Sequence, residues 1–324
     1  MKKHDILLAT TAILSCAILA ESVRAEIKSE VSCGGKCTYY YDTVTHDMRW
    51  EKNADVGADE EVILRGSSYN IPGKYGLKDV NNLTIGEGIT GLGYDALWSY
   101  AGYSLGNSNS TLVLPSTLKS NVATTGDQAI HYVLFGTIDA SALKDADMYI
   151  QASSNLHTLI VDQNSSSVIK IGAGYGSYPT SVTIQCKGDK TKCQSQVQRV
   201  SNTTTFTPEY YSGPDGNGNW EEWSDDGKAV YADSTKAKPL ATYGFDGKQT
   251  ASYNYNASGL LLSANTYDAE GNVVGSYNYT YDAGGNLVSA YQNGKAVYLR
   301  KRYTIPEADA ATQGKGPFRL DITW

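Results

Sequence analysis

The sequence predicts a mainly β protein in which a degenerate leucine-rich-repeat-like β-solenoid is followed by an antiparallel Tyr-rich β-meander. Two observations support this fold class. Short runs of aliphatic and β-branched residues recur through the first half, separated by stretches rich in Gly, Ser, Asn and Asp. In the second half a Tyr-[Asn/Asp]-Ala-x-Gly motif occurs three times, beginning at Tyr255, Tyr267 and Tyr281. A period that short accommodates one strand and one turn.

The N-terminus has the composition of a secretory signal. Lys2 and Lys3 precede an apolar run from Ile6 to Leu19, and Val23-Arg24-Ala25 has the small-x-small pattern of a cleavage site. The run is too short to cross a bilayer comfortably and nothing comparable follows it. We therefore expect cleavage after Ala25 and an exported mature chain without a transmembrane span. A lipoprotein signal acylated at Cys16 is the alternative.

Charge and cysteine content narrow the range of partners and cofactors. A net charge of −7 without any basic block argues against nucleic acid as a partner. Four cysteines follow Ala25, and an even number in an exported chain favours disulfides, with three possible connectivities. Proximity favours Cys33–Cys37 and Cys186–Cys193, each of which would contribute about 2–2.5 kcal/mol. The scattered histidines of the mature chain argue against a zinc site.

Residues 26–200 are predicted to form a solenoid of short stacked strands. Each strand is too short to bury its apolar face alone, so neighbouring strands must stack. We interpret the apolar positions as the solenoid core. The strands are expected at Val62–Leu64, Leu83–Ile85, Leu112–Leu114, Tyr132–Phe135, Met148–Ile150, Thr158–Val161 and Val182–Ile184.

Three segments of this region share their patterns with a known family. Asn82–Leu97 combines a strand ending in Ile with a Gly-rich return, Thr111–Leu118 is a strand followed by Pro-Ser, and Cys33–Tyr39 reads Cys-Gly-Gly-Lys-Cys-Thr-Tyr. These segments resemble the repeats and the opening of BspA-like leucine-rich repeat surface proteins. Leu97 stands where that family usually has Phe, and the usual Cys-x-x-Leu tail is missing. The resemblance covers about residues 30–195 and implies a leucine-rich-repeat-like solenoid at the cell surface.

Residues 205–303 are predicted to form seven or eight antiparallel strands. In each motif Asp or Asn opens a type I turn, and Gly takes the left-handed conformation that closes a three-residue hairpin. Two-residue hairpins are expected at Asp226-Gly227, Asp246-Gly247 and Asn293-Gly294.

Alternation along these strands predicts a face lined with tyrosines. From Val273 to Tyr281, Gly and Tyr alternate with small polar residues, and the preceding repeat has the same phase. Cross-strand packing is one interpretation. Exposed tyrosines could instead stack on sugar rings or on an apolar partner surface. The candidate binding residues are Tyr253, Tyr255, Tyr277, Tyr279 and Tyr281. The repeats resemble the YD-type repeats of the Rhs family, which display other segments, but lack their fuller Gly-Arg-Leu-type continuation.

Candidate chemistry is sparse elsewhere. Asp215, Asn217 and Asn219 place oxygen atoms at alternate positions, as a calcium loop does. Trp220 occupies the position where an EF-hand requires Gly, so a flexible turn accounts for the same residues. The chain has no His-Glu-x-x-His motif, and we expect neither a cofactor nor enzymatic activity.

The sequence therefore predicts an exported, non-catalytic repeat protein that presents a β surface for adhesion or for binding an unknown protein or glycan outside the cell. The alternatives are a carbohydrate-binding or carbohydrate-active secreted protein and a structural spacer. The expected domains are the signal peptide 1–25, the solenoid 26–200, the hairpin repeats 205–303 and a C-terminal segment 304–324. In that segment a Thr-x-x-Glu capping box at Thr304 predicts a short helix to about residue 312, followed by a strand.

Overall fold

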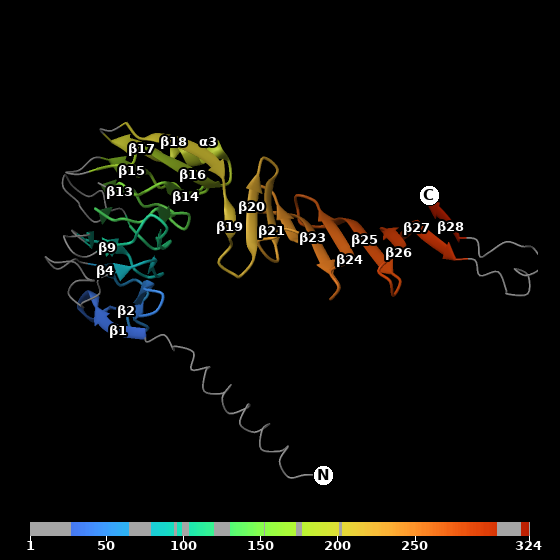
Figure 1. Ribbon diagram of the computed structural model, residues 1–324, viewed down its shortest axis with the longest axis horizontal. Coiled ribbons are helices and arrows are strands. Elements are labelled where there is room, and N and C mark those ends of the chain that lie inside the picture. The colour runs from blue at the N-terminus through green and yellow to red at the C-terminus, as the bar shows by residue number, and fades with distance from the viewer. Residues whose placement is uncertain are drawn as a thin grey trace, which may run out of the picture. The chain divides into compact units, whose positions relative to one another are not determined.

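The computed structural model describes residues 27–64, 79–93, 96–98, 104–119, 130–151, 153–172, 177–200, 203–302 and 319–323. These residues form a mainly β protein with a solenoid followed by an antiparallel sheet, which confirms the predicted fold class (Figure 1). The signal peptide 1–25 and the helix expected over 304–312 lie outside the described residues. No helix among the described residues is both long and apolar enough to cross a membrane.

The chain divides into two compact units that interleave in sequence. The first comprises Met1–Leu159, Ser165–Val182 and Gln196–Phe206, and the second comprises Ile160–Asn164, Thr183–Ser195 and Thr207–Trp324. The second unit thus includes the ends of the last solenoid strands together with the whole antiparallel sheet.

From β10 onward each turn of the solenoid contributes one strand to each of two parallel-paired sheets, and the earlier turns carry additional short strands. The nine-stranded sheet has the order β1 (Ile27–Ser32), β2 (Cys37–Asp42), β3 (Met48–Lys52), β6 (Leu83–Ile85), β10 (Thr111–Val113), β12 (Thr137–Asp139), β14 (Thr158–Asp162), β16 (Ser181–Lys187) and β18 (Thr205–Tyr210). The five-stranded sheet comprises β17 (Val197–Val200), β15 (Ile169–Gly172), β13 (Met148–Gln151), β11 (Ile130–His131) and β8 (Leu97–Trp98), all paired in parallel. The solenoid also contains two separate two-stranded parallel sheets. One pairs β4 (Ile63–Leu64) with β7 (Gly91–Leu92), and the other pairs β5 (Asp79–Val80) with β9 (Ser104–Leu105).

The core of the solenoid is a stack of aliphatic residues from successive turns. Leu83, Leu112 and Ile138 lie opposite one another in adjacent parallel strands, and each is fully buried. Stacking of this kind removes from water the apolar faces that single short strands could not bury alone.

The strand predicted at Tyr132–Phe135 is wrong. The chain forms β11 just before this segment and β12 just after it. Val133 and Phe135 are fully buried, so the apolar signal reflects core packing rather than a strand. Tyr132 has a φ of 54°, in the left-handed region, which is incompatible with extended backbone.

Both disulfides join the cysteines that lie closest in sequence. Cys33 is bonded to Cys37 across the short 3-10 turn η1 (Cys33–Gly35), between β1 and β2. Cys186 is bonded to Cys193 and ties the single described α-helix, α3 (Lys190–Ser195), to β16.

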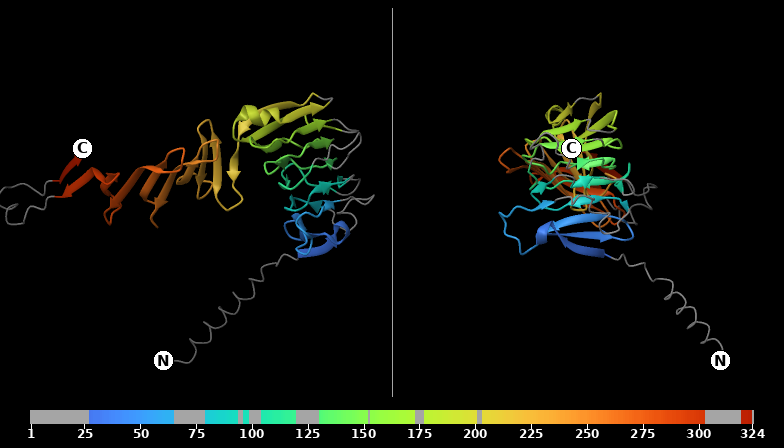
Figure 2. Two further views of the ribbon diagram at one scale, coloured as in Figure 1. Left: turned by 180° about the vertical axis from the view of Figure 1, so that it is seen from behind. Right: turned by 90° about the vertical axis from the view of Figure 1, so that its left-hand side faces the viewer.

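The second sheet is a ten-stranded antiparallel meander in sequence order. Its strands are β19 (Ser212–Pro214), β20 (Trp220–Ser224), β21 (Gly227–Tyr231), β22 (Pro239–Tyr243), β23 (Gln249–Tyr255), β24 (Leu261–Tyr267), β25 (Val273–Tyr281), β26 (Leu287–Gln292), β27 (Lys295–Arg302) and β28 (Arg319–Thr323). Nine of these strands, β19 to β27, lie within 205–303, where seven or eight were expected, and β28 is the strand expected in the C-terminal segment. The first strand of that range, β18, belongs to the solenoid sheet instead. Figure 2 shows β22 to β27 as a single layer, with no described helix or second sheet on either face.

Candidate binding face of the antiparallel sheet

Five turns of one type connect strands of the meander. In each, the N–H of the first residue donates to the carbonyl of the fifth at 2.9–3.0 Å. The fourth residue is always a glycine, with φ between 77° and 89°. These turns span residues 215–219, 244–248, 256–260, 268–272 and 282–286. The three-residue hairpin closures predicted at Gly259, Gly271 and Gly285 are therefore confirmed, and a further copy at 244–248 escaped the sequence motif. The turn 215–219 is a variant, because its second residue, Gly216, also has a positive φ of 82°.

The residues considered as a calcium loop form the first of these turns. The Asp215 carboxylate accepts hydrogen bonds from the backbone N–H groups of Asn217 and Asn219, at 2.7 and 3.1 Å, and from the Asn219 side-chain amide at 3.0 Å. The hydrogen bond from the Asn219 amide, followed by those from the backbone, lowers the pKa of Asp215. Asp268 and Asn272 make the same contacts in a later turn. Turn formation therefore accounts for these side chains without a cation.

The two-residue hairpins were predicted with mixed success. Asn293 and Gly294 both have positive φ and connect the paired residues Gln292 and Lys295, as expected. Asp246-Gly247 instead occupies the third and fourth positions of the five-residue turn 244–248. The first residue of this turn is Gly244, whereas the other four turns begin with Asp or Asn. At β20–β21 the loop lies one residue earlier than expected, because Gly227 pairs with Ser224.

The strand register places all five predicted tyrosines on one face. Tyr253 lies opposite Ala264, which lies opposite Tyr277 on the next strand. Directly opposed residues project to the same side, and so do alternate residues along a strand. We call this side the tyrosine face; it comprises Tyr253, Tyr255, Tyr277, Tyr279, Tyr281 and Tyr298. Tyr298, opposite Ala290, was missed because β27 contains no motif copy.

The tyrosine rings lie against the sheet rather than standing away from it. Ala264 is only 9% exposed although no second layer covers it, so its flanking tyrosines must shield it. A Cβ atom on Gly275 would lie 3.2 Å from Cε2 of Tyr277, which places that ring over its own strand. The tyrosines of the face are half-buried. Each such ring packs one side on the sheet and turns the other outward.

The tyrosine hydroxyls fall into two classes. The Tyr281 hydroxyl donates to the carbonyl of Leu261 at 2.8 Å, and the Tyr277 hydroxyl accepts from the Gln292 amide at 3.2 Å. The hydroxyls of Tyr253, Tyr255 and Tyr279 have no hydrogen-bond partner among the described residues. Burial raises the pKa of Tyr255 and of Tyr279 above the ordinary tyrosine value of 10.0. Both hydroxyls are protonated at neutral pH, as tyrosines generally are, and can donate hydrogen bonds.

The strands β22 to β26 contain no Asp, Glu, Lys or Arg on either face. Every charged residue between Pro239 and Gln292 lies in a turn. Opposite the tyrosine face, a cross-strand row of Asn254, Ser263 and Asn278 presents amides and hydroxyls. The absence of charge from these strands is visible in the sequence, and it is the signal that sequence reasoning overlooked.

A shallow groove of about 580 Å³ lies at one end of the tyrosine face. It runs between the turn 256–260, which joins β23 to β24, and the turn 282–286, which joins β25 to β26. Leu260, Leu262, Tyr279 and Tyr281 supply its apolar lining, and Asn256 and Ser258 are among its polar residues. The groove therefore combines aromatic walls with neutral hydrogen-bonding groups and one carboxylate, that of Asp282, which lies 3.8 Å from Arg300 Nη1.

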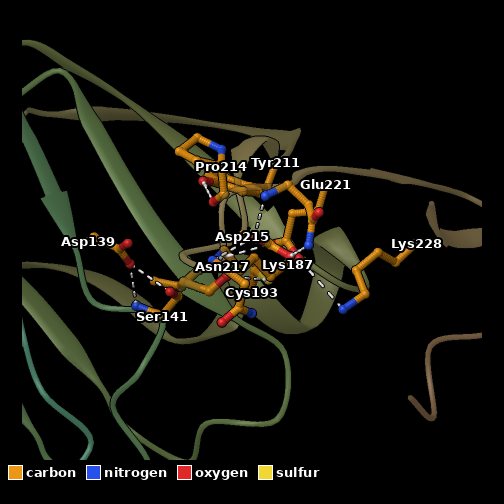
Figure 3. Close-up of polar contacts among 12 residues, drawn as sticks. Asp139, Ser141, Lys187, Cys193, Tyr211, Pro214, Asp215, Asn217, Glu221 and Lys228 are labelled. Carbon is orange, nitrogen blue, oxygen red and sulfur yellow. Dashed lines mark hydrogen bonds and ion pairs between the residues drawn. The ribbon is translucent and has the colours of Figure 1, made fainter. Parts of the chain in front are cut away.

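A second cluster of polar side chains in the same unit, centred on Glu221, has its charges compensated within the fold. Figure 3 shows the buried Glu221 carboxylate held by two lysines, with Lys187 Nζ at 3.0 Å and Lys228 Nζ at 3.6 Å. Lys187 also lies 4.4 Å from the ring centroid of Tyr211, whose hydroxyl donates to the Pro214 carbonyl. The carboxylate is thus compensated by its own neighbours. Within the described ranges, no group of three or more His, Cys, Asp or Glu residues has an arrangement suited to a metal ion.

Comparisons with protein-family models, with curated proteins and with solved structures found no match for this chain. Its function must therefore be inferred from its own residues.

Proposed function

We propose that this protein is an exported, non-catalytic repeat protein that binds an extracellular partner through the tyrosine face. The main support is one observation: the uncharged strands β22 to β26 form a single layer that presents half-buried tyrosines, and some of their hydroxyls have no partner among the described residues. Aromatic rings with one outward side offer a large contact area at a low cost in side-chain entropy.

Export is supported by the signal-like N-terminus and by the two disulfides, because disulfides persist in oxidising compartments. In this proposal the solenoid, which resembles BspA-like repeats, anchors or orients the binding sheet at the cell surface. The hydrophobic residues of its core remain structural.

The test is a binding panel with matched variants of the mature full-length chain. Labelled protein is applied to immobilised glycans and extracellular matrix proteins, and a triple variant Tyr253→Ala/Tyr277→Ala/Tyr279→Ala is compared with Tyr291→Ala. Tyr291 lies opposite Asn278 on the other face of the same sheet, so its replacement controls for general loss of packing.

We expect at least one panel member to bind the wild type and the Tyr291→Ala variant, but not the triple variant. Equal binding by all three proteins would exclude the tyrosine face as the contact surface. Circular dichroism of each variant confirms that the sheet is still formed.

A further inference from the structure

We infer that the tyrosine face binds a neutral, unbranched polysaccharide, whose sugar rings stack on Tyr253 and Tyr277. This inference rests on the proposed binding role of that face and assigns the chemical class of its ligand.

The spacing of the rings favours an extended chain of sugars. Tyr253 and Tyr277 lie in one cross-strand row with Ala264 between them, so their backbones are separated by two strand spacings, roughly 10 Å. That separation is close to the length of a disaccharide in an extended polysaccharide. Alternate sugar rings can then meet alternate tyrosines, while the intervening ring passes over the small alanine.

Ring orientation suits the same ligand. Because the Tyr277 ring lies over Gly275, its outward side is a flat surface of one ring's width. The C–H side of a pyranose is a flat apolar surface of similar size, and aromatic rings hold such surfaces by dispersion and by removing them from water. Tyr279 and Tyr298 repeat the arrangement around Ala290, which extends the platform toward β27.

Hydrogen bonding and charge distinguish the ligand class further. Sugar hydroxyls both donate and accept, and the unpartnered hydroxyls of Tyr253 and Tyr279 can do the same. Acidic polysaccharides are held by Arg and Lys, which β22 to β26 lack entirely. The uncharged central strands of the face therefore suit an uncharged ligand, and the charged Asp282 and Arg300 toward β27 pair with each other at 3.8 Å.

The groove beside Tyr279 would accept one end of the bound chain. Its apolar lining of Leu260, Leu262 and Tyr281 is bordered by Asn256 and Ser258, so a sugar ring there would contact both apolar and polar groups.

The experiment uses affinity gel electrophoresis of the mature full-length chain. The gels contain neutral hydroxyethyl cellulose, neutral unbranched mixed-linkage β-glucan, acidic alginate or no polysaccharide, and pull-down on insoluble cellulose and chitin accompanies them. Every gel and every pull-down is run at low and at high salt. The variants are Tyr253→Ala, Tyr277→Ala, Tyr277→Phe and, as the control on the opposite face, Tyr291→Ala.

We expect a neutral polysaccharide to bind the protein equally at both salt concentrations. Loss of one stacking ring should weaken binding about tenfold. Tyr277→Phe, which keeps the ring, should retain most of the affinity, as should Tyr291→Ala. The Phe variant also guards against misreading a folding defect as a loss of binding.

Tyrosine-dependent binding only to alginate in these gels, or only to proteins in the binding panel, would overturn the proposed ligand class. It would leave the proposed binding role of the tyrosine face intact. Binding of neutral polysaccharide that is unaffected by Tyr253→Ala and Tyr277→Ala would overturn both. Failure of every neutral polysaccharide to bind would also reject the inference.

Discussion

The hydroxyl of Tyr281 donates a hydrogen bond to the backbone carbonyl of Leu261, 2.8 Å away on the strand that precedes its own. Tyr267, the motif tyrosine of the preceding hairpin, reaches back in the same way, with its hydroxyl 2.9 Å from Ser252 Oγ. At these two positions the motif tyrosine therefore fastens each hairpin to the one before it. Tyr253, Tyr277 and Tyr279 do not begin a motif copy, and we assign binding mainly to them.

Replacement of Tyr281 by Phe should destabilise the sheet without affecting its packing. The ring remains, but the Leu261 carbonyl loses its donor, so the free energy of unfolding should fall by about 1 kcal/mol. Urea denaturation followed by circular dichroism measures this change. Tyr279→Phe is the matched control, because its hydroxyl has no partner among the described residues, and it should change stability little. Equal effects of the two changes would refute the fastening role.

Replacement of Gly271 by Ala should strain the turn 268–272. Gly271 has a φ of 86° and a Cβ there would meet nothing within 4 Å, so the backbone conformation alone opposes the change. The expected loss is about 1–2 kcal/mol. Thermal unfolding of this variant is compared with Glu270→Ala, an exposed change in the same turn. A melting temperature equal to that of the control would show that the left-handed conformation is not required.

Asp268 should make stability depend on pH in acid. The backbone N–H of Asn272, and then its side-chain amide, lower the pKa of this carboxyl below its ordinary value of 3.8. Because the folded pKa is the lower one, the contribution is fully present above about pH 4 and is lost as pH falls through the folded pKa. Asp268→Asn should therefore lose less stability than the wild type between pH 7 and pH 3, as measured by urea midpoints. A larger loss in the variant would contradict this sign.

Glu221 should be one of the most sensitive positions of the second unit. The residue is 5% exposed and its carboxylate compensates both Lys187 and Lys228, so Glu221→Ala leaves two partly buried ammonium groups without a counter-ion. The expected cost is about 3 kcal/mol. Glu222→Ala is the control, because its side chain is 37% exposed and its ion pair with Lys236 contributes under about 1 kcal/mol. Chemical denaturation with equal midpoints for both variants would argue against the buried cluster.

Turn chemistry was the most predictable part of the fold, because the conformation is dictated by single residues. Gly259, Gly271 and Gly285 each adopt the left-handed conformation expected of them. The copies at 215–219 and 244–248 were not recognised as turns of this type. One resembles a ligand loop in composition, and the other begins with Gly244, which has no side chain to accept the capping hydrogen bonds.

Solenoid strands were less predictable, because apolar character does not distinguish a strand from a buried loop. Val133 and Phe135 are as buried as any strand residue, yet the left-handed Tyr132 beside them is set by the tertiary path of the chain. For the candidate site, alternation was enough to group the five tyrosines. The ring orientations and the split between engaged and unpartnered hydroxyls depend on cross-strand neighbours such as Ala264 and Gln292.

In the single-layer meander each strand is hydrogen-bonded only to the strands before and after it. Removing or duplicating two consecutive strands would leave the pairing of all the others unchanged. In the central strands the tyrosine face places a ring on every second strand, at Tyr253 and again at Tyr277, so each duplication would add one more contact of the same kind. The number of hairpins would then set the length of ligand that the face can hold. Proteins that differ only in the number of these hairpins would bind ligands of different length and with different residence times.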